Sequence, residues 1–350
     1  MPHQLPVKIV DFYLAQGRDL PWRASKQAYF VHVSETMLQQ TRVETVIGYF
    51  ERFMGLFPTV FDLASAEESQ VLLAWEGLGY YSRAKNLHKA AKMVVSEFEG
   101  IYPRDKELLL SLPGVGEYTA NAILAFSKDE RAIPVDGNVL RLFSRLTGYG
   151  DNVLEEKAKR FAESYFLEQM GGSVPSLYCQ GLMELGEVIC LPRSPKCDFC
   201  PLTKMCIAFK EGRQDKLPVR IKRNKRRCEE KTALVYAFGD SHGYEFREGE
   251  GLLSHLYGFP LLDGQLGLKG VKDHLKEKGL GKCKVSPLCE YKHVFSHVEW
   301  RVKAYLIELA SQEGLDLSFL TLEQRRMTFA LPTAFRPIET SLKGKKARKN

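Results

Sequence analysis

Residues 112–145 constrain the fold more than any other stretch of the chain. They begin with a glycine-rich turn, which lies between two apolar runs of helical spacing. The two runs cover residues 108–112 and 119–126, and Gly114 and Gly116 lie between them. Glycine lets the backbone adopt positive φ and lets a ligand approach closely. The first N–H groups of a helix also form a ready site for a phosphate group. The pattern therefore predicts a helical hairpin whose turn is suited to binding a phosphate.

An aspartate follows this hairpin, just before the next expected helix. Asp136 stands between Val135 and Gly137, and residues 138–146 again show helical spacing. A carboxylate held there would face whatever the hairpin binds. Taken alone, the stretch also fits an ordinary helical hairpin with a surface aspartate, because Gly-rich turns between helices are common.

The composition indicates a soluble globular protein with room for two domains. The chain has 350 residues, of which 44% are hydrophobic and 27% charged. Its net charge of +7 permits a polyanionic partner but does not require one. No apolar run has the length of a membrane span, and the N-terminus lacks the basic and apolar regions of a signal peptide. We therefore expect a cytoplasmic protein whose eight cysteines are reduced.

The segment before the hairpin is expected to be helical. Apolar positions keep helical spacing in residues 7–14, 29–41 and 43–53, and residues 18–23 form a loop between the first two runs. Glu35 lies off the apolar face of its run. By position alone, Glu35 fits a solvated helix residue better than a catalyst.

Further helical runs are interrupted by one unusual loop. Ser65 and Glu68 have the spacing of a capping box at the start of a helix. The Gly- and Tyr-rich loop of residues 77–83 suits either turn packing or insertion of its aromatic side chains between base steps. Later helical runs cover residues 84–98, 154–169 and 177–189. The chain up to this point is thus predicted to be all-α.

Four closely spaced cysteines come next. Cys190, Cys197, Cys200 and Cys206 have the spacing C-x6-C-x2-C-x5-C. In a reducing compartment such a group is most simply a set of metal ligands, and both zinc and a cubic iron–sulfur cluster accept four thiolates. Structural zinc sites usually show two C-x2-C pairs, and only one is present here. The remaining cysteines lack such spacing and are read as structural thiols: Cys179, Cys228, Cys283 and Cys289.

The composition changes after the cysteines. Residues 210–231 form a basic linker that either contacts phosphates or is simply solvated. Residues 232–335 contain strand-like runs and a charged helical run at about 269–278, which predicts a separate α+β domain. Residues 336–350 are expected to be a basic tail, disordered over the final nine residues. The strand-like runs are residues 232–238, 243–247, 289–293 and 299–307, and the basic residues of the linker are Lys222, Arg223, Lys225, Arg226 and Arg227.

Together these motifs resemble the MutY-type adenine DNA glycosylases, a branch of the helix-hairpin-helix superfamily that includes endonuclease III. The resemblance covers roughly residues 5–335. It implies an all-α glycosylase domain at residues 1–209, with a 4Fe–4S cluster on the four cysteines of the loop 190–206, and a C-terminal Nudix-like α+β domain. The stretches that carry it are Leu-Pro-Trp-Arg, Ser-Glu-Thr-Met-Leu-Gln-Gln-Thr, Gly-Leu-Gly-Tyr-Tyr-Ser-Arg-Ala, the hairpin, Val-Asp-Gly-Asn-Val, the four cysteines and Phe-Ser-His.

The resemblance implies excision of adenine mispaired with 8-oxoguanine or guanine in double-stranded DNA. Glu35 matches the family's general acid, which protonates adenine at N7 and needs a raised pKa. Asp136 matches the carboxylate that stays ionised and stabilises the oxocarbenium-like state. Tyr118 stands where lyases of the superfamily place a lysine, and tyrosine cannot form a Schiff base. Tyr118 and Asn138 are therefore expected to support Asp136 in a monofunctional glycosylase.

The same resemblance supplies the residues expected to contact DNA. Ser296 within the sequence Phe295-Ser296-His297 matches the loop that reads 8-oxoguanine, although the Nudix box of the pyrophosphatases is absent. Gln40 and Tyr80 match residues that insert into the duplex. The adenine pocket and DNA surface are expected to comprise Arg23, Gln39, Gln40, Thr41, Leu78, Gly79, Tyr80, Gly114, Val115, Gly116, Gln180 and Glu184.

Three alternatives stay open at this stage. A thymine or uracil mismatch glycosylase of the same superfamily can also carry tyrosine at the hairpin, but such enzymes generally lack a second domain. A glycosylase with lyase activity on oxidised pyrimidines is disfavoured by Tyr118. A non-catalytic lesion-binding protein would not need both Glu35 and Asp136. We expect a monomer that acts on the nucleoid, with no membrane partner.

Overall fold

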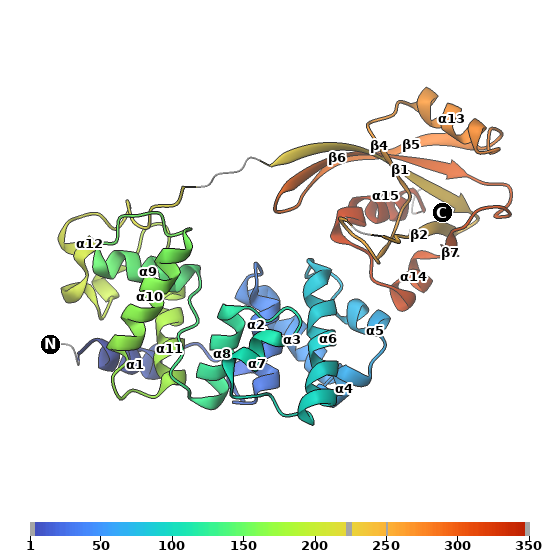
Figure 1. The fold of residues 1–350 in the computed structure, drawn as a ribbon. Coiled ribbons are helices and arrows are strands. Elements are labelled where there is room, and N and C mark those ends of the chain that lie inside the picture. The colour runs from blue at the N-terminus through green and yellow to red at the C-terminus, as the bar shows by residue number, and fades with distance from the viewer. Residues whose placement is uncertain (1–3, 222–225, 250, 347–350) are drawn as a thin grey trace. The chain divides into compact units, whose positions relative to one another are not determined.

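Two compact units make up the chain (Figure 1). One unit contains residues 1–66 and 82–223, and the other contains residues 67–81 and 224–350. The C-terminal unit therefore includes a short segment from the middle of the helical region. The computed structural model describes residues 4–221, 226–249 and 251–346.

The first unit is helical, and residues 4–221 contain no strand, so the all-α prediction is confirmed for this part of the chain. Its helices are α1 (Gln4–Gln16), α2 (Ala28–Leu38), α3 (Val43–Leu56), α4 (Val60–Ser65), α6 (Tyr81–Phe98), α7 (Lys106–Ser111), α8 (Glu117–Lys128), α9 (Gly137–Thr147), α10 (Glu156–Gln169), α11 (Pro175–Glu184) and α12 (Ile207–Lys210). They are joined by short 3-10 turns at Pro21–Arg23, Cys197–Phe199 and Thr203–Met205 and by a π-helical turn at Leu185–Ile189.

The core of the first unit forms where α2 and α11 both pack against α8, and α1 packs against α11. Val33 and Met37 of α2 and Ile123 of α8 are fully buried. Burial of each such side chain contributes about 1.5–3 kcal/mol to the free energy of unfolding. The position of Glu35 on its own helix favoured a solvated residue, and that interpretation was wrong, because α2 is covered on more than one side and Glu35 is buried. Its burial agrees with the raised pKa that the family resemblance implied.

The predicted capping box of Ser65 and Glu68 does not form. Ser65 is the last residue of α4, so it cannot begin the next helix. Helix α5 (Glu68–Ala74) is capped two residues later than expected, at Glu67, whose backbone N–H donates to Oε1 of Gln70 at 3.1 Å. A capping box thus forms, but it is shifted by two residues because α4 extends through Ser65.

The second unit is built on a mixed seven-stranded sheet, which confirms the α+β prediction. The strand order is β3-β2-β1-β6-β5, with β4 also paired to β1 and β7 to β2. The long central strands β1 and β6 are parallel, and the other pairs are antiparallel. The strands are β1 (Arg227–Phe238), β2 (Ser241–Phe246), β3 (Tyr257–Gly258), β4 (Leu261–Asp263), β5 (Lys284–Val294), β6 (Val298–Glu308) and β7 (Ser318–Leu320), and the helices are α5, α13 (Leu268–Glu277), α14 (Leu322–Thr328) and α15 (Arg336–Lys346).

Side-chain alternation along β1 supplies a core to each face of this sheet. Ala233 and Val235 face the cluster that contains Ile338 of α15. Leu234 points the other way and joins the cluster that contains Val271 of α13. Helices α13 and α15 accordingly cover opposite faces of the sheet (Figure 1).

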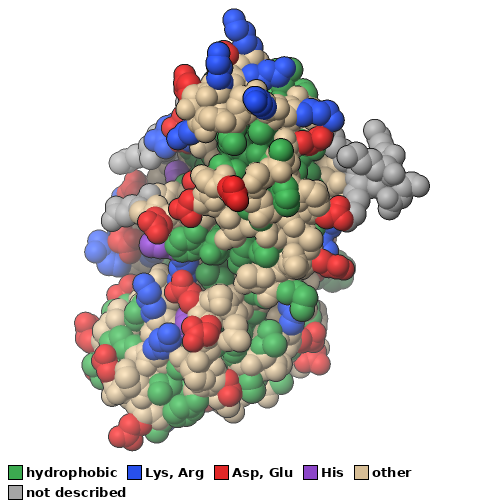
Figure 2. All heavy atoms as spheres, turned by 90° about the vertical axis from the view of Figure 1, so that its right-hand side faces the viewer, with side chains coloured by type: hydrophobic (Ala, Val, Ile, Leu, Met, Phe, Trp, Pro, Cys, Tyr) green, Lys and Arg blue, Asp and Glu red, His purple; other side chains and the backbone are tan. Residues whose placement is uncertain are grey.

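The outer side of α13 is charged. Lys269, Lys272 and Lys276 are exposed together with Asp273 and Glu277, while Val271 and Leu275 are buried against the sheet. Lysine and arginine side chains gather at the upper end of the face drawn in Figure 2, which is the end that carries α13 in Figure 1. The amphipathic pattern of this helix thus separates its charge from its core side cleanly.

Two boundaries differ from those expected. The linker was predicted to run through Lys231, but β1 begins at Arg227, because this stretch pairs in parallel with β6. Residues 222–225, with Lys222, Arg223 and Lys225, lie outside the described residues. The tail was predicted to start at residue 336, but residues 336–346 form α15, in which Leu342 packs into the core beside Ile338. Residues 347–350 of the predicted tail, with Arg348 and Lys349, also lie outside the described part. No described helix is both long and apolar enough to cross a membrane.

Candidate active site

A cavity of about 840 Å³ lies within the first unit. The start of α8, the start of α9, one face of α2 and the C-terminal half of α11 supply most of its wall. Segments far apart in the sequence therefore converge on one space. Most of the expected site residues of this unit line it: Arg23, Glu35, Gln39, Gln40, Thr41, Gly114, Gly116, Tyr118, Asp136, Asn138, Gln180 and Glu184.

Glu35 is a buried carboxyl group in the wall of this cavity. Its exposed fraction is 6%, and burial raises its pKa to about 7. The Tyr118 hydroxyl donates a hydrogen bond to Oε2 of Glu35 at 2.6 Å, which lowers the pKa, whereas the negative charge of Asp136 raises it. Glu35 can thus hold a proton near neutral pH and release it into the cavity.

Asp136 is the N-cap residue of α9. Its Oδ1 accepts hydrogen bonds from the backbone N–H groups of Asn138 at 2.9 Å and Val139 at 2.7 Å. Burial raises the pKa of Asp136, while these two N–H donors and the nearby Arg141 oppose the rise. The helix N-terminus therefore holds this carboxylate in place and stabilises its charge.

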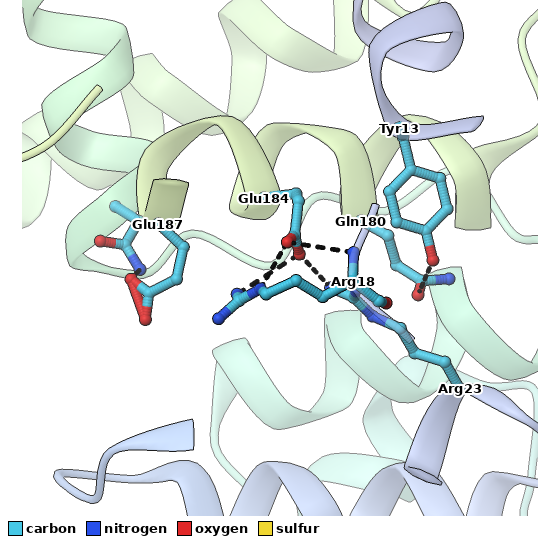
Figure 3. A network of polar contacts seen from close by, with 7 residues as sticks. Tyr13, Arg18, Arg23, Gln180, Glu184 and Glu187 are labelled. Carbon is cyan, nitrogen blue, oxygen red and sulfur yellow. Dashed lines mark hydrogen bonds and ion pairs between the residues drawn. The ribbon is translucent and has the colours of Figure 1, made fainter. Parts of the chain in front are cut away.

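Glu184 is the second buried carboxylate among the described residues of the cavity, and its environment differs from that of Glu35. Arg18 Nε lies 2.5 Å from Oε1 of Glu184, and Arg23 Nη2 lies 2.7 Å from Oε2. Figure 3 shows the two guanidinium groups converging on this carboxylate. Although burial alone raises its pKa, the hydrogen bonds from Arg18 and Arg23 hold the pKa of Glu184 below its usual range. Glu184 is therefore ionised at neutral pH, in contrast to Glu35, whose pKa is raised to about 7.

Two residues of this network, Tyr13 and Arg18, were missed by the sequence analysis. The Tyr13 hydroxyl donates to Oε1 of Gln180 at 2.6 Å, and the Arg23 guanidinium lies over the Tyr13 ring at 5.2 Å (Figure 3). Tyr13 sits in an amphipathic helix without a motif. Arg18 opens the same Arg-Asp-Leu-Pro-Trp-Arg loop that supplied Arg23, so its position was a usable signal.

Asn138 is tied to the cysteine loop through Arg141. Arg141 is 3% exposed, and its Nη2 donates to Oδ1 of Asn138 at 2.8 Å and to the Gly186 carbonyl at 2.7 Å. Its Nε donates to the Cys190 carbonyl at 2.7 Å. A Cβ atom at Gly186 would lie 2.6 Å from the Asn138 Cβ, so only glycine allows the π-helical turn to approach α9 this closely.

The hairpin turn has the backbone that its glycines predict. Gly114 has φ +78°, and a Cβ atom there would lie 2.6 Å from the Asn86 Cβ. Gly116 is the N-cap residue of α8 and faces open space. Val115 is buried beneath the turn, so it supports the hairpin but is not part of the cavity wall. The turn thus leaves backbone N–H groups accessible on the cavity side.

The end of α2 carries a second turn at the cavity edge. Gln40 is exposed and has φ +57°, directly after the C-cap residue Gln39. Arg83 Nη1 donates to the carbonyls of Thr36 at 2.7 Å, Met37 at 3.0 Å and Gln39 at 2.7 Å. Arg83 thereby satisfies the last carbonyl groups of the helix and holds the turn before Gln40. The Thr41 side chain donates to the Gln39 carbonyl at 3.4 Å.

The four cysteines of the loop face one small cavity of about 30 Å³, and all are free thiols. Arg145 lies in the same wall, where its Nη1 donates to Sγ of Cys190 at 3.3 Å. Within residues 4–221, 226–249 and 251–346, no group of three or more His, Cys, Asp or Glu side chains is arranged to hold a metal ion. The structure therefore brings the four side chains to one place without defining a site for a single ion.

The other expected DNA-contacting residues belong to the second unit. Tyr80 is 44% exposed with φ +49°, between Gly79 with φ +74° and the buried Tyr81. Leu78 is buried. In the turn between β5 and β6, Ser296 and His297 are exposed, and Phe295 packs edge-on against Trp300 at 4.9 Å.

Comparisons with known proteins agree with this geometry. Residues 33–166 match the model of the HhH-GPD superfamily base excision DNA repair proteins. An adenine DNA glycosylase of Buchnera aphidicola subsp. Schizaphis graminum is 34% identical over 307 residues, which cover 86% of this chain and 87% of the relative. The adenine DNA glycosylase of Rattus norvegicus is 40% identical over 222 residues, or 60% of this chain and 43% of the relative. A thermostable thymine-DNA glycosylase superposes with a TM-score of 0.54 and 27% identity over 60% of this chain and 97% of its own.

The helical unit and its cavity therefore define a base-excision DNA glycosylase of the HhH-GPD class, which hydrolyses N-glycosyl bonds. Within that class, the chain belongs to the adenine DNA glycosylase family.

Proposed function

We propose that this enzyme removes adenine mispaired with 8-oxoguanine or guanine from double-stranded DNA and leaves an intact abasic site. The observation that carries the proposal is the pairing of two carboxyl groups with opposite tasks in one cavity. Glu35 has a pKa of about 7 and accepts a hydrogen bond from Tyr118, whereas Asp136 accepts hydrogen bonds from two backbone N–H groups. Such a pair suits acid-assisted departure of a base from a sugar.

Glu35 is proposed to protonate adenine at N7, because neutral adenine is a poor leaving group. As the N-glycosidic bond lengthens, positive charge develops on the deoxyribose. Asp136 is proposed to stabilise that charge, and Asn138 to keep the carboxylate and the sugar in place. Tyr118 carries no amine, so no Schiff base forms and the DNA strand is not cut.

Adenine has to leave the base stack before it can reach Glu35. The cavity of about 840 Å³ has room for an extruded nucleotide. We propose that the hairpin at Gly114 and Gly116 binds the DNA backbone through N–H groups, and that Gln40 and Tyr80 enter the duplex. The exposure of both side chains and their left-handed backbones support these roles, since neither side chain is packed into a core.

A 4Fe–4S cluster is the proposed resident of the cysteine loop. Four thiols facing one cavity, with the Arg145 guanidinium donating to Cys190 Sγ, suit an anionic cluster held by four thiolates. When bound, it would supply a rigid scaffold for the loop and could exchange electrons. Arg141 would connect the loop backbone to Asn138 through the Cys190 carbonyl.

The C-terminal unit is proposed to be a Nudix-like domain that reads the base opposite adenine. Its mixed sheet with helices on both faces supports this proposal. Ser296 is the proposed contact to 8-oxoguanine, at an exposed turn that Phe295 anchors on Trp300. The sequence lacks the Nudix box, so no pyrophosphatase activity is proposed.

The test uses labelled duplexes with A opposite 8-oxoguanine, A opposite G, and T opposite G, each assayed with and without alkali. We expect cleavage of the adenine strand only after alkali treatment. Glu35→Gln and Asp136→Asn should keep DNA binding while lowering the single-turnover rate by about 10²–10⁴-fold. Cleavage without alkali would overturn the role of Tyr118.

Release of thymine from T opposite G would instead favour a thymine mismatch glycosylase. That second candidate rests on the similarity of the helical unit to a thymine-DNA glycosylase, which extends over 60% of this chain. Retained excision by either carboxamide variant would refute the proposed chemistry.

A further inference from the structure

The loop after α5 has a backbone that only specific support can keep in one conformation. Gly77 has φ +107°, Gly79 has φ +74° and Tyr80 has φ +49°. A left-handed backbone is unfavourable for a tyrosine, so its surroundings must stabilise it. The Tyr80 side chain itself is 44% exposed.

The support comes from residues on either side of Tyr80. Trp75 is fully buried, and its Nε1 donates to the Gly79 carbonyl at 3.1 Å. The Tyr81 hydroxyl donates to the Leu331 carbonyl, just after α14, at 3.3 Å. Leu78 is 7% exposed. Hydrogen bonds thus hold the backbone on either side of Tyr80, whose side chain is partly exposed.

Arg325 of α14 makes a third contact, an ion pair with the residue before the loop. Its Nη1 lies 2.8 Å from Oε1 and 3.1 Å from Oε2 of Glu76, the residue before the loop. Its Nη2 donates to Glu339 of α15. Arg325 is among the most deeply buried side chains of the protein, with 1% exposed, while Glu76 is 21% and Glu339 10% exposed. Ion pairs this deeply buried are geometrically selective, because each charge depends on its partners.

A buried arginine with two carboxylates does not need both of them for charge balance. Glu339 alone would neutralise the guanidinium from within the C-terminal segment. Glu76 adds a second negative charge and comes from a segment about 250 residues earlier, as shown by its sequence separation of 249 from Arg325. The additional ion pair therefore joins α14 to the residue directly before the loop 77–80.

We propose that Arg325 is a positioning residue for DNA binding: by holding Glu76, it fixes the loop so that Tyr80 is presented to the duplex in one conformation. An exposed aromatic ring on a rigid loop suits stacking against bases, with little ordering to be done on binding. The inference rests on the proposed function for the identity of the nucleic acid. Residues of α14, and not of the loop alone, then determine how tightly Tyr80 binds the duplex.

The test is made on the full chain with Glu76→Gln, which loosens the loop but leaves the Arg325–Glu339 pair. Glu339→Gln is the matched control, because it weakens the other arm of the same arginine. Tyr80→Ala sets the size of the complete loss. Substituting Arg325 itself would leave two carboxylates without their partner and could unfold the unit, so it is not the primary variant.

Two measurements separate positioning from general stability. The first is the Kd for a duplex with a non-cleavable 2′-fluoro-deoxyadenosine opposite 8-oxoguanine, by fluorescence anisotropy. The second is hydrogen–deuterium exchange of the peptide that covers residues 76–83. We expect Glu76→Gln to weaken binding by about tenfold and to speed exchange in this peptide, while Glu339→Gln changes the Kd by less than about threefold. The single-turnover rate at saturating enzyme should stay within about twofold for Glu76→Gln, because Glu35 is untouched.

Unchanged binding by Glu76→Gln would overturn the proposal, as would equal weakening by both glutamine variants without faster exchange at residues 76–83. Failure of the proposed function would look different. In that case the native protein would release no adenine from any duplex, whereas the Kd and exchange measurements do not depend on excision.

Discussion

The phenolic oxygen of Tyr118 lies 2.6 Å from Oε2 of Glu35, so the residue proposed to exclude lyase chemistry also contacts the proposed general acid. Burial has the larger effect on Glu35 and raises its pKa to about 7, while the Tyr118 hydroxyl lowers the pKa. Tyr118 thus carries no amine that could form a Schiff base, and it limits how strongly Glu35 holds its proton.

The excision rate should depend on pH through Glu35. In the proposed mechanism the protonated form is active, so the rate should be constant below the folded pKa and fall as pH rises through about 7. The check is the single-turnover rate from pH 5 to about 9 at saturating enzyme. A rate that rises through this range would show that Glu35 acts as a base.

The same group should make the protein less stable as pH rises. The pKa of Glu35 is raised from 4.5 to about 7 on folding, so its contribution is fully present below about 4.5 and is lost as pH rises through the folded value. A shift of this size corresponds to about 3 kcal/mol of unfolding free energy. Glu35→Gln should flatten this part of the stability curve, measured by urea unfolding between those pH values. An identical curve for the variant would contradict the assignment.

Tyr118→Phe should move the alkaline limit of the rate to higher pH. Removing the hydroxyl removes a hydrogen bond that lowers the pKa of Glu35, while its burial is unchanged. Tyr13→Phe is the matched control, because that hydroxyl bonds Gln180 and not Glu35. The measurement is the pH–rate profile of each variant. If the alkaline limit of Tyr118→Phe moved to lower pH, a group other than the Tyr118 hydroxyl would control the pKa of Glu35.

Alanine at Gly114 should destabilise the protein much more than alanine at Gly116. At Gly114 a Cβ atom meets Asn86 at 2.6 Å and the backbone has φ +78°, so we expect a loss of about 1–3 kcal/mol. At Gly116 nothing lies within 4 Å and φ is −102°, so the change should stay within about 0.5 kcal/mol. Calorimetric unfolding temperatures provide the comparison. Equal losses would mean that the hairpin tolerates no side chain for reasons other than contact and φ.

Arg141→Met should destabilise the first unit by about 3 kcal/mol or more, since it removes the donor from the carbonyls of Gly186 and Cys190, in two buried hydrogen bonds, and from the part-buried Oδ1 of Asn138. Arg104→Met is the control, because Arg104 is 70% exposed and pairs with Glu130 at the surface. Urea unfolding followed by helical circular dichroism gives both values. Similar midpoints for the two variants would show that the Arg141 bonds add nothing net.

Much of the first unit could be predicted, because the spacing of apolar residues indicates its helices and the glycines indicate its hairpin turn. The environment of Glu35 could not be predicted, since its position off the apolar face says nothing about helices that cover that face from elsewhere. The partners of Glu184 were hidden for the same reason: Arg18 and Arg23 lie more than 160 residues away in sequence. Spacing predicts which side a residue takes on its own helix, whereas burial is decided by the others.

In the second unit, the alternation of side chains along β1 could be predicted from the sequence. The start of β1 and the C-terminal helix α15 could not. The basic composition at Arg227 and at Lys343 favoured a linker and a tail, because charge was the only local signal. Pairing with β6 extends the strand to Arg227, and two apolar residues one turn apart, Ile338 and Leu342, hold α15 on the core. Two apolar residues are enough to place a short charged helix when the apolar face of a sheet is there to pack against.

Residues 67–81 belong by their contacts to the C-terminal unit, although they lie in the middle of the helical sequence. The protein is therefore not modular at its linker. A shortened chain that stops before β1 would keep α5 with its buried Val71 and Leu72 but lose α14, against which α5 packs. A chimaera that exchanges C-terminal units between relatives has to carry this internal segment along, and sequence changes on α5 and α14 are expected to be inherited together.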